Sequence, residues 1–177
     1  MPLIFVGGHS ASAADFGFEH GTAVVVLRSP KAIYAAVDSK EIDQTYRDGK
    51  LSLDEKVVCK VRKVGPYYSI VAGIMRGTNG FDALQEAFNA YTPGDDLEKL
   101  GSAISQSVPV SLAPLLETML ETDPAMFVKN YAAQAALHLT LIGNEQNVPK
   151  VVVVEFQAVK KAEGPISDFA LNSVRRK

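Results

Sequence analysis

Two neighbouring apolar segments, "TAVVVLR" (22–28) and "KAIYAAVD" (31–38), constrain the fold of this chain more than any other feature of its sequence. Both are rich in β-branched and apolar residues, and only Ser29-Pro30 separates them, which predicts two strands of a hairpin. Neither segment alternates apolar with polar residues, so each strand presents apolar side chains on both faces. Strands of this kind need cover on both faces of their sheet. The sequence therefore predicts a layered fold.

Four further apolar segments predict two more hairpins. They are residues 56–64, 67–73, 136–142 and 148–159. Gly65-Pro66 divides the first pair, and a turn is expected at residues 143–145 in the second. The charged segment 39–55 lies between the first two hairpins of the chain, and we expect a polar loop there.

The middle of the chain has the sequence period of helices. The apolar residues that mark one face of a first helix are Phe81, Leu84, Phe88 and Tyr91. A second helix is expected from about residue 95, interrupted by Pro109 and Pro114, because proline removes a helical hydrogen bond. The helical pattern continues to residue 131, and we expect residues 166–174 to begin a last helix.

Strands, then helices, then strands again along one chain indicate an α+β fold built in layers. We expect a four-layer αββα sandwich, in which two mostly antiparallel sheets pack on each other and helices cover the outside of each. A three-layer arrangement, with one sheet between two layers of helices, stays open as the alternative. The 177 residues suffice for one domain with a full core. We assign residues 1–21 to a leader and residues 22–177 to this single domain.

The leader starts with a short apolar piece, "PLIFVGG", followed by the small residues of "HSASAAD". This order is typical of the end of a secretory signal, although no positive charge precedes the apolar piece. Three interpretations stay open: a signal peptide of which residues 1–14 are the remnant, a pro-segment, or an ordinary disordered or strand-forming leader. The first interpretation would make the protein an exported one.

Charge and composition argue against several classes of function. A formal net charge of −2 gives no electrostatic reason to expect a nucleic-acid partner. No apolar run approaches the roughly 20 residues that span a bilayer. The single Cys59 excludes an internal disulfide framework, and the three histidines lack metal-ligand spacing. No phosphate-binding loop is present either, so we expect neither a metal nor another cofactor.

Four features at fixed spacing stand out against this background. Gly21-Thr22 lies directly before the first strand, and Asp38 ends the second strand sixteen residues after the threonine. Lys60 lies within the expected apolar strand 56–64, where burial of an unpaired charge would be costly. Gly73 closes the fourth strand.

In these residues and their spacing the chain resembles the β-subunits of the proteasome, and among them the bacterial ATP-dependent proteasome-like peptidases. The resemblance covers residues 21–88, including "CKVRKVGP" around the lysine and "RGTNGFDALQEAF" at the first helix. It continues in the order of elements to about residue 159. The chain is shorter at its C-terminal end than the pattern of this family.

The resemblance implies an N-terminal-nucleophile hydrolase, that is, a threonine-type peptidase or amidohydrolase. Self-cleavage between Gly21 and Thr22 would free an α-amine with an ordinary pKa of about 7.7–8.0, and this amine would act as the base for the Thr22 hydroxyl. Lys60 would supply a positive charge that disfavours the protonated amine, and Asp38 would hold Lys60 in place. The amide N–H of Gly73 would face the oxyanion.

The resemblance also implies partners: a peptide or protein substrate, further copies of the chain in a homo-oligomer, and an unfolding ATPase. It implies a cytoplasmic location. Two positions depart from the family pattern. Lys40 stands where an arginine is usual, and Ile42 replaces a small hydroxyl residue that helps to bind the substrate backbone.

Two other classes of function stay open. One is a catalytically inactive scaffold or interaction subunit of the same fold, comparable to the α-type subunits of that family. An ordered strand or helix in the leader would favour it. The other is an exported binding domain in which the bond between Gly21 and Thr22 stays uncut.

Overall fold

The computed structural model describes residues 3–6, 23–47, 50–77, 79–131, 134–160 and 169–176. These residues form an α+β fold with antiparallel sheets, as expected. The elements in chain order are β1 (Leu3–Val6), β2 (Val24–Arg28), β3 (Ile33–Val37), β4 (Lys40–Arg47), β5 (Lys50–Val57), β6 (Val61–Val64), β7 (Tyr67–Gly73), α1 (Ala83–Asn89), α2 (Leu97–Thr122), α3 (Pro124–Tyr131), β8 (Ala135–Glu145), β9 (Val148–Lys160) and β10 (Phe169–Arg176).

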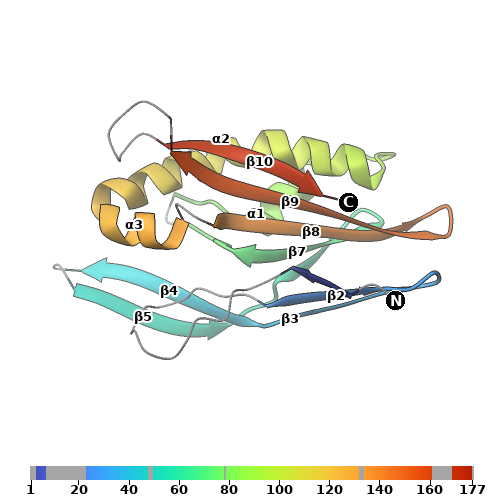
Figure 1. Ribbon diagram of the computed structural model, residues 1–177, viewed down its shortest axis with the longest axis horizontal. Helices are drawn as coiled ribbons and strands as arrows, with labels where there is room; N and C mark the ends of the chain where they lie inside the picture. Colours follow the sequence, from blue (N-terminus) through green and yellow to red (C-terminus); the bar gives the residue numbers. More distant parts are fainter. Residues whose placement is uncertain are drawn as a thin grey trace.

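The strands form three open sheets (Figure 1). The largest has the order β10-β9-β8-β7-β6, and all of its neighbouring strands are antiparallel. A second sheet has the order β1-β2-β3, and β4 pairs with β5 in a two-stranded sheet of its own. The three helices lie on one side of the five-stranded sheet, and the two smaller sheets lie on the other side.

The main core lies between the helices and the five-stranded sheet. Alternate residues of β8 and β9 point toward α2, among them Leu139 and Val154, and pack with Leu100 and Ile104 of the helix. A smaller apolar cluster lies on the opposite face of the sheet. There Val24 and Val26 of β2 pack with Ile70 and Ala72 of β7. Because both faces of β7 are covered, the burial of its apolar residues 70–72 is explained.

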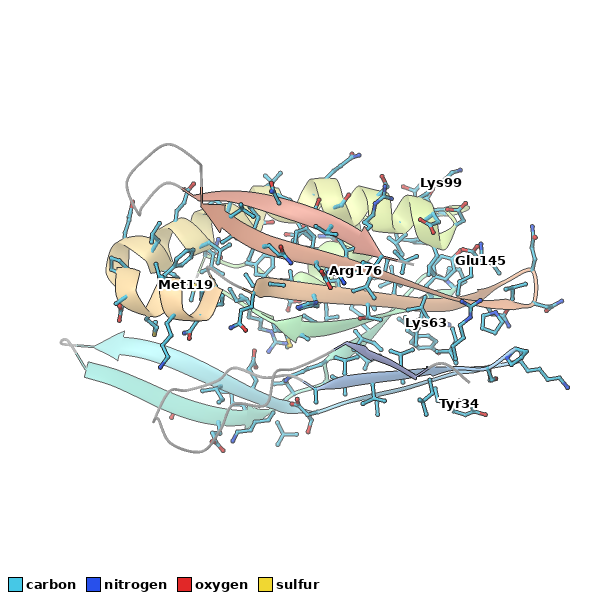
Figure 2. All side chains as sticks on the ribbon, in the orientation of Figure 1. Tyr34, Lys63, Lys99, Met119, Glu145 and Arg176 are labelled. Atoms are coloured by element: carbon cyan, nitrogen blue, oxygen red, sulfur yellow. The ribbon has the colours of Figure 1, made fainter. Side chains whose placement is uncertain are left out.

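The outer face of β2 and β3 is open in the described part of the chain. Tyr34 of β3 is 64% exposed and points away from the molecule (Figure 2). Ala36 and Val25 are exposed on the same hairpin. The described residues thus supply a helical layer and two layers of strands. The outer helical layer of the expected four-layer sandwich is not among them.

Part of the expected leader is a strand. Residues 3–6 form β1, which pairs antiparallel with β2 from Leu3 opposite Leu27 to Val6 opposite Val24. The first residues of the chain therefore contribute to the same sheet as the opening hairpin. Of the three interpretations of the leader, this pairing favours a strand-forming one.

The expected polar loop at residues 39–55 is wrong, because β4 and β5 form a regular hairpin there, from Lys40 opposite Val57 to Arg47 opposite Lys50. This hairpin is a two-stranded sheet of its own, and its strands pair with neither of the larger sheets (Figure 1). The dipeptide Asp48-Gly49, which is typical of a hairpin turn, was the sequence signal for it.

Two expectations about helices are also wrong. Helix α2 continues through Pro109 and Pro114 from Leu97 to Thr122. Each internal proline costs about 3 kcal/mol, and burial of apolar side chains along the whole helix, at about 1.5–3 kcal/mol for each leucine, offsets that cost. In the segment 166–174, expected to begin a last helix, residues 169–174 belong to the strand β10, because β9 offers them an unpaired edge.

The turn between β8 and β9 follows the residues 143–145 at which it was expected. β8 extends to Glu145, and the turn is made by Gln146 and Asn147, which have positive φ angles of 52° and 65°. Two successive residues with positive φ define a tight hairpin turn whose twist matches that of the strands. Glu145 is therefore a strand residue, and its carboxylate is available for other contacts.

Candidate functional site

Asp38 follows β3, and its carboxylate is the centre of a polar cluster. Its Oδ2 atom accepts a hydrogen bond of 2.7 Å from the backbone N–H of Ala23. Its Oδ1 atom accepts hydrogen bonds of 3.0 Å from Lys60 Nζ and 3.0 Å from the backbone N–H of Lys40. The Asp38 N–H in turn donates to the carbonyl of Ala23 over 3.2 Å. Asp38 thus ties the start of β2 to Lys60.

Lys60 precedes β6 and is only 5% exposed. Its carbonyl accepts a hydrogen bond of 3.0 Å from the N–H of Val71, which fixes its backbone to β7. Its ammonium group donates to Asp38 and to the carbonyl oxygen of Lys40. Removing an unpaired ammonium from water costs several kcal/mol, so these acceptors account for a lysine in this apolar segment. The ion pair expected between Asp38 and Lys60 is present.

The environment favours the ionised form of Asp38. Partial burial raises the pKa of its carboxyl group, but the hydrogen bond from Lys60, the N–H groups of Ala23 and Lys40 and the lysine charge together outweigh burial. The net effect holds the pKa of Asp38 below its usual value of 3.8. Asp38 is therefore a carboxylate at neutral pH.

The expected nucleophile, Thr22, and its neighbour Gly21 lie outside the described residues. The nearest described position is Ala23, whose amide nitrogen forms the peptide bond to Thr22. This same amide donates the 2.7 Å hydrogen bond to Asp38. The structure therefore places the Asp38–Lys60 pair beside the residue that follows the expected nucleophile.

Gly73 ends β7 with a positive φ of +90°, a backbone conformation that favours glycine. A Cβ atom at this position would lie 2.4 Å from the carbonyl oxygen of Ala136 in β8. The same oxygen accepts a hydrogen bond of 2.9 Å from the N–H of Ile74. Backbone conformation and close packing thus already require a glycine here, and the oxyanion role of its N–H stays a prediction.

The structure adds two backbone groups that sequence reasoning missed. The carbonyl of Lys40 accepts from the Lys60 ammonium, and the amide of Ala23 donates to Asp38. Neither group has a sequence signal, because every residue carries them. The side chain of Lys40, which stands where the family has arginine, instead forms an exposed ion pair of 2.7 Å with Glu55.

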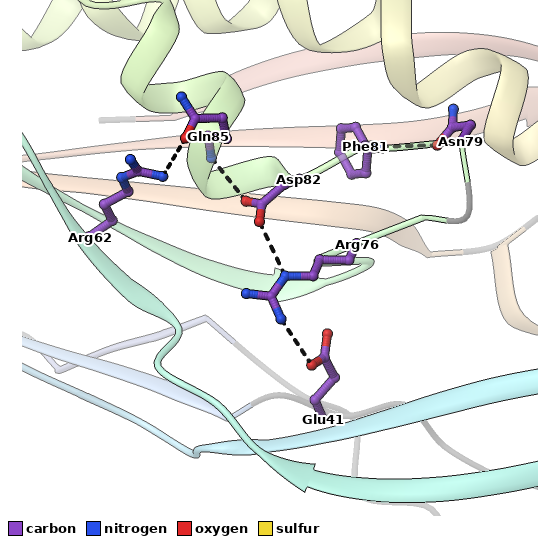
Figure 3. A network of polar contacts seen from close by, with 7 residues as sticks. All are labelled: Glu41, Arg62, Arg76, Asn79, Phe81, Asp82 and Gln85. Carbon is purple, nitrogen blue, oxygen red and sulfur yellow. Dashed lines mark hydrogen bonds and ion pairs between the residues drawn. The ribbon is translucent and has the colours of Figure 1, made fainter.

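A second polar network beside this cluster was also missed (Figure 3). Arg76 lies three residues after Gly73, and its Nε atom donates to Asp82 over 3.1 Å. Its Nη1 atom lies 3.6 Å from a carboxylate oxygen of Glu41 in β4. Asp82 also caps α1, accepting a hydrogen bond of 2.9 Å from the N–H of Gln85. Arg76 therefore links β4 to the start of the first helix.

Other sequence candidates have structural explanations. Met75 is buried in the main core. His138 is a β8 residue, and burial lowers its pKa although Glu155, 3.6 Å away, acts in the opposite direction. No group of three metal-ligating side chains occurs among the described residues. None of the helices in the described ranges combines the length and apolar composition that a bilayer crossing requires.

Comparisons of the chain with protein families, with curated proteins and with solved structures found no match.

Proposed function

We propose that the chain is an N-terminal-nucleophile hydrolase. Within this class, we propose a threonine-type peptidase or amidohydrolase of the proteasome-like kind, with Thr22 as the nucleophile. The observation that carries the proposal is the cluster in which Asp38 joins the Ala23 amide to the buried Lys60 ammonium. Its two side chains, Asp38 and Lys60, are those that the resemblance assigns to the support of such a nucleophile.

Activation would proceed by self-cleavage. The Thr22 hydroxyl oxygen attacks the Gly21 carbonyl carbon, the peptide C–N bond breaks, and the departing nitrogen takes a proton to become the α-amine of Thr22. Water then hydrolyses the resulting ester, which leaves a carboxylate on Gly21 and restores the hydroxyl. The absence of a Cβ on glycine eases the approach of the hydroxyl.

In the processed protein, the Thr22 amine would accept the proton of its own hydroxyl as the oxygen attacks a substrate carbonyl. The Lys60 charge supports this role because a neighbouring cation lowers the pKa of an amine. The geometry supports it as well, because Asp38 and the Lys40 carbonyl hold the ammonium group beside the start of β2. The Gly73 N–H would stabilise the oxyanion, a contact worth about 3 kcal/mol in comparable sites.

The finer architecture belongs to the same proposal. We propose a four-layer sandwich in which an outer helical layer covers the β2–β3 face that carries the exposed Tyr34. A peptide or protein substrate, assembly of the chain into a homo-oligomer, and an unfolding ATPase that delivers substrates follow from the same resemblance. No step of this chemistry requires a cofactor.

The test is covalent labelling. Purified protein is treated with a threonine-directed electrophile, such as a peptide β-lactone, and the labelled residue is mapped by mass spectrometry. We expect label on Thr22, loss of label in Thr22→Ala, and full labelling of the control Thr92→Ala, which alters an exposed threonine of a loop. Equal labelling of Thr22→Ala and the unchanged protein would overturn the proposal.

One observation favours a second candidate, a catalytically inactive scaffold or interaction subunit of the same fold. β1 lies within the expected leader and pairs with β2 along four residues, Leu3 to Val6. A leader that supplies a strand to the sheet has a structural role of its own. This role does not require the leader to be cleaved. In this case the Asp38–Lys60 pair stabilises the fold, and we expect no residue to be labelled and residues 1–21 to be retained.

A further inference from the structure

One buried carboxylate within the five-stranded sheet faces two groups that can carry a positive charge. It belongs to Glu155 of β9, which is 7% exposed. Its Oε2 atom lies 3.1 Å from Nη2 of Arg176 in β10, which Figure 2 labels. Its Oε1 atom lies 3.6 Å from Nδ1 of His138 in β8. Glu155 therefore connects the two strands that flank β9.

The strand register places these three groups on one face of the sheet. His138 lies directly opposite Ala72 of β7 on one side and directly opposite Glu155 on the other. Val174 lies opposite Glu155 from β10, and Arg176, two residues further along that strand, has the same orientation. Among the described residues, Glu155 and Arg176 are the charged groups that act on the His138 ring, and its neighbour from β7 is apolar.

The two partners of Glu155 differ in how freely they can leave it. Arg176 is 67% exposed, and its strand is an edge strand that pairs only with β9 among the described strands. Water can therefore replace the carboxylate as the partner of the guanidinium group. His138 is 25% exposed and lies on a strand that is paired on both sides. The ring thus stays beside Glu155, whereas the arginine can move into solvent.

The protonation state of His138 decides how many cations face Glu155. The buried Nδ1 atom of the ring has no hydrogen-bond partner in the described part of the chain. Burial lowers the pKa of His138, Glu155 raises it and Arg176 lowers it again, so that the net pKa lies below 6.5. The ring is therefore neutral at neutral pH, and Arg176 is then the counterion of Glu155. On acidification the ring gains a proton and becomes a second cation beside the same carboxylate.

The influence of these two cations on each other is reciprocal. Because the charge of Arg176 disfavours the protonated ring, the protonated ring weakens the contact between Arg176 and Glu155 by the same free energy. The lowered pKa also fixes the sign of the effect on stability. Below pH 6.5 the folded protein binds this proton more weakly than the unfolded chain does, so acidification removes stability. Release of Arg176 relieves part of this cost, because it separates the two cations.

We propose that His138 and Glu155 form a pH-sensitive switch that controls the docking of the C-terminal end of β10. At neutral pH, Arg176 binds Glu155 and holds residues 174–176 on β9. In acid, the protonated ring becomes the partner of the carboxylate, and Arg176 is released together with this end of the strand. The release uncovers unpaired backbone groups at the edge of β9. The switch does not depend on the proposed hydrolase chemistry.

The test is an NMR titration of the full chain from about pH 7.5 to about pH 5, the range in which a histidine changes its charge. It follows the three histidine rings and the backbone amides of residues 173–175. The signal that is missing in His138→Gln identifies the His138 ring. We expect this ring to titrate with a midpoint below 6.5 and the amides to shift with the same midpoint. In His138→Gln the amides should show no transition in this range.

Two arginine variants provide a matched comparison. Arg176→Gln removes the cation beside Glu155 and should raise the His138 midpoint by about half a pH unit, which corresponds to about threefold weaker docking of Arg176 on the protonated protein. The control is Arg175→Gln. It removes the neighbouring arginine, whose Nη1 atom donates to the carbonyl of Glu98 over 3.4 Å, and should leave the midpoint unchanged.

Either half of the switch can fail in these titrations. An unchanged His138 midpoint in Arg176→Gln, or an equal rise in both arginine variants, would overturn the coupling between the ring and Arg176. Amide shifts in β10 that persist in His138→Gln would overturn the role of the histidine. Amide shifts of β7 that match those of the unchanged protein at neutral pH verify that each variant is folded.

Discussion

The molecule contains two clusters built from the same parts but with opposite burial. In one, Asp38 accepts from Lys60 and from two backbone N–H groups. In the other, Glu145 accepts from Lys150 over 2.5 Å, from the N–H of Leu97 over 2.5 Å and from the hydroxyl of Tyr67 over 3.0 Å.

The two clusters differ in which member of the ion pair is buried. At the candidate site, the lysine is 5% exposed and Asp38 is 34% exposed. At the β8–β9 turn the order is reversed, because Glu145 is 14% exposed and Lys150 is 43% exposed. A buried carboxylate at the first N–H groups of α2 stabilises the start of the helix. The buried ammonium group of Lys60 lies beside the start of β2, where there is no helix end for the cluster to stabilise. It is suited instead to lowering the pKa of a neighbouring amine such as that of a processed Thr22.

The largest expected effect tests whether the Asp38–Lys60 cluster serves catalysis and the Glu145–Lys150 cluster serves stability. It compares substitutions of the two lysines. Lys60→Met should reduce peptide hydrolysis about 100-fold or more, because it removes the charge that lowers the pKa of the amine base and leaves Asp38 without its partner, and general-base catalysis contributes about 100- to 10,000-fold. Lys150→Met removes the corresponding lysine of the other cluster and should change hydrolysis less than about twofold, since it lies near the helix start. The measurement is kcat/KM with a fluorogenic peptide. Equal losses in the two variants would contradict the assignment.

The two regions also differ in what their glycines contact. A Cβ at Gly73 would meet a backbone oxygen in a conformation with φ of +90°, and one at Gly143 would lie 2.3 Å from the ring of Tyr67. A backbone atom cannot move aside as a ring can, so Gly73→Ala should cost about 2–4 kcal/mol of unfolding free energy. Gly143→Ala should cost less. Urea unfolding measures both, and the reverse order would show that the β7–β8 pairing is looser than described.

A smaller effect is expected for the carboxylates. Glu145→Gln should lower the free energy of unfolding by about 1–3 kcal/mol, because it weakens hydrogen bonds to a charged and mostly buried acceptor. Hydrolysis should be unchanged. Asp38→Asn should show the opposite balance, with a clear loss of hydrolysis and a smaller loss of stability, since Asp38 is the more exposed carboxylate. Unfolding curves and kcat/KM for both variants provide the comparison.

The smallest effect is the dependence of stability on pH. Burial raises the pKa of Glu145, but the hydrogen bonds from Lys150, Leu97 and Tyr67 outweigh it and hold the pKa below 4.5. A lowered pKa gives stability that is present above pH 4.5 and is lost as the pH falls toward the folded-state value. The stability difference between the unchanged protein and Glu145→Gln should therefore be largest near pH 7 and shrink below pH 4.5. A difference that grows on acidification would contradict the described hydrogen bonds.

Local sequence patterns predicted those elements whose own residues determine them. The apolar runs that became β2, β3, β7 and β8 are buried or paired as expected. Patterns failed where distant contacts decide the structure. Burial of apolar side chains along α2 keeps the helix continuous through Pro109 and Pro114. Pairing with β9 makes β10 a strand.

The same distinction applies to the site. The resemblance implied the pairing of Asp38 with Lys60, and burial of a lysine among apolar residues indicated only that it needs some acceptor. The Lys40 carbonyl, the Ala23 amide and the link from Arg76 to Glu41 depend on how distant segments meet, and residue types alone do not specify that.

The most direct test of the central claim is the N-terminal sequence of the purified protein after incubation at neutral pH. The account predicts a chain that begins Thr-Ala-Val-Val-Val, with residues 1–21 released, and it predicts that Thr22→Ala keeps its original N-terminus. An unchanged protein that still begins upstream of Thr22 after prolonged incubation would contradict the account.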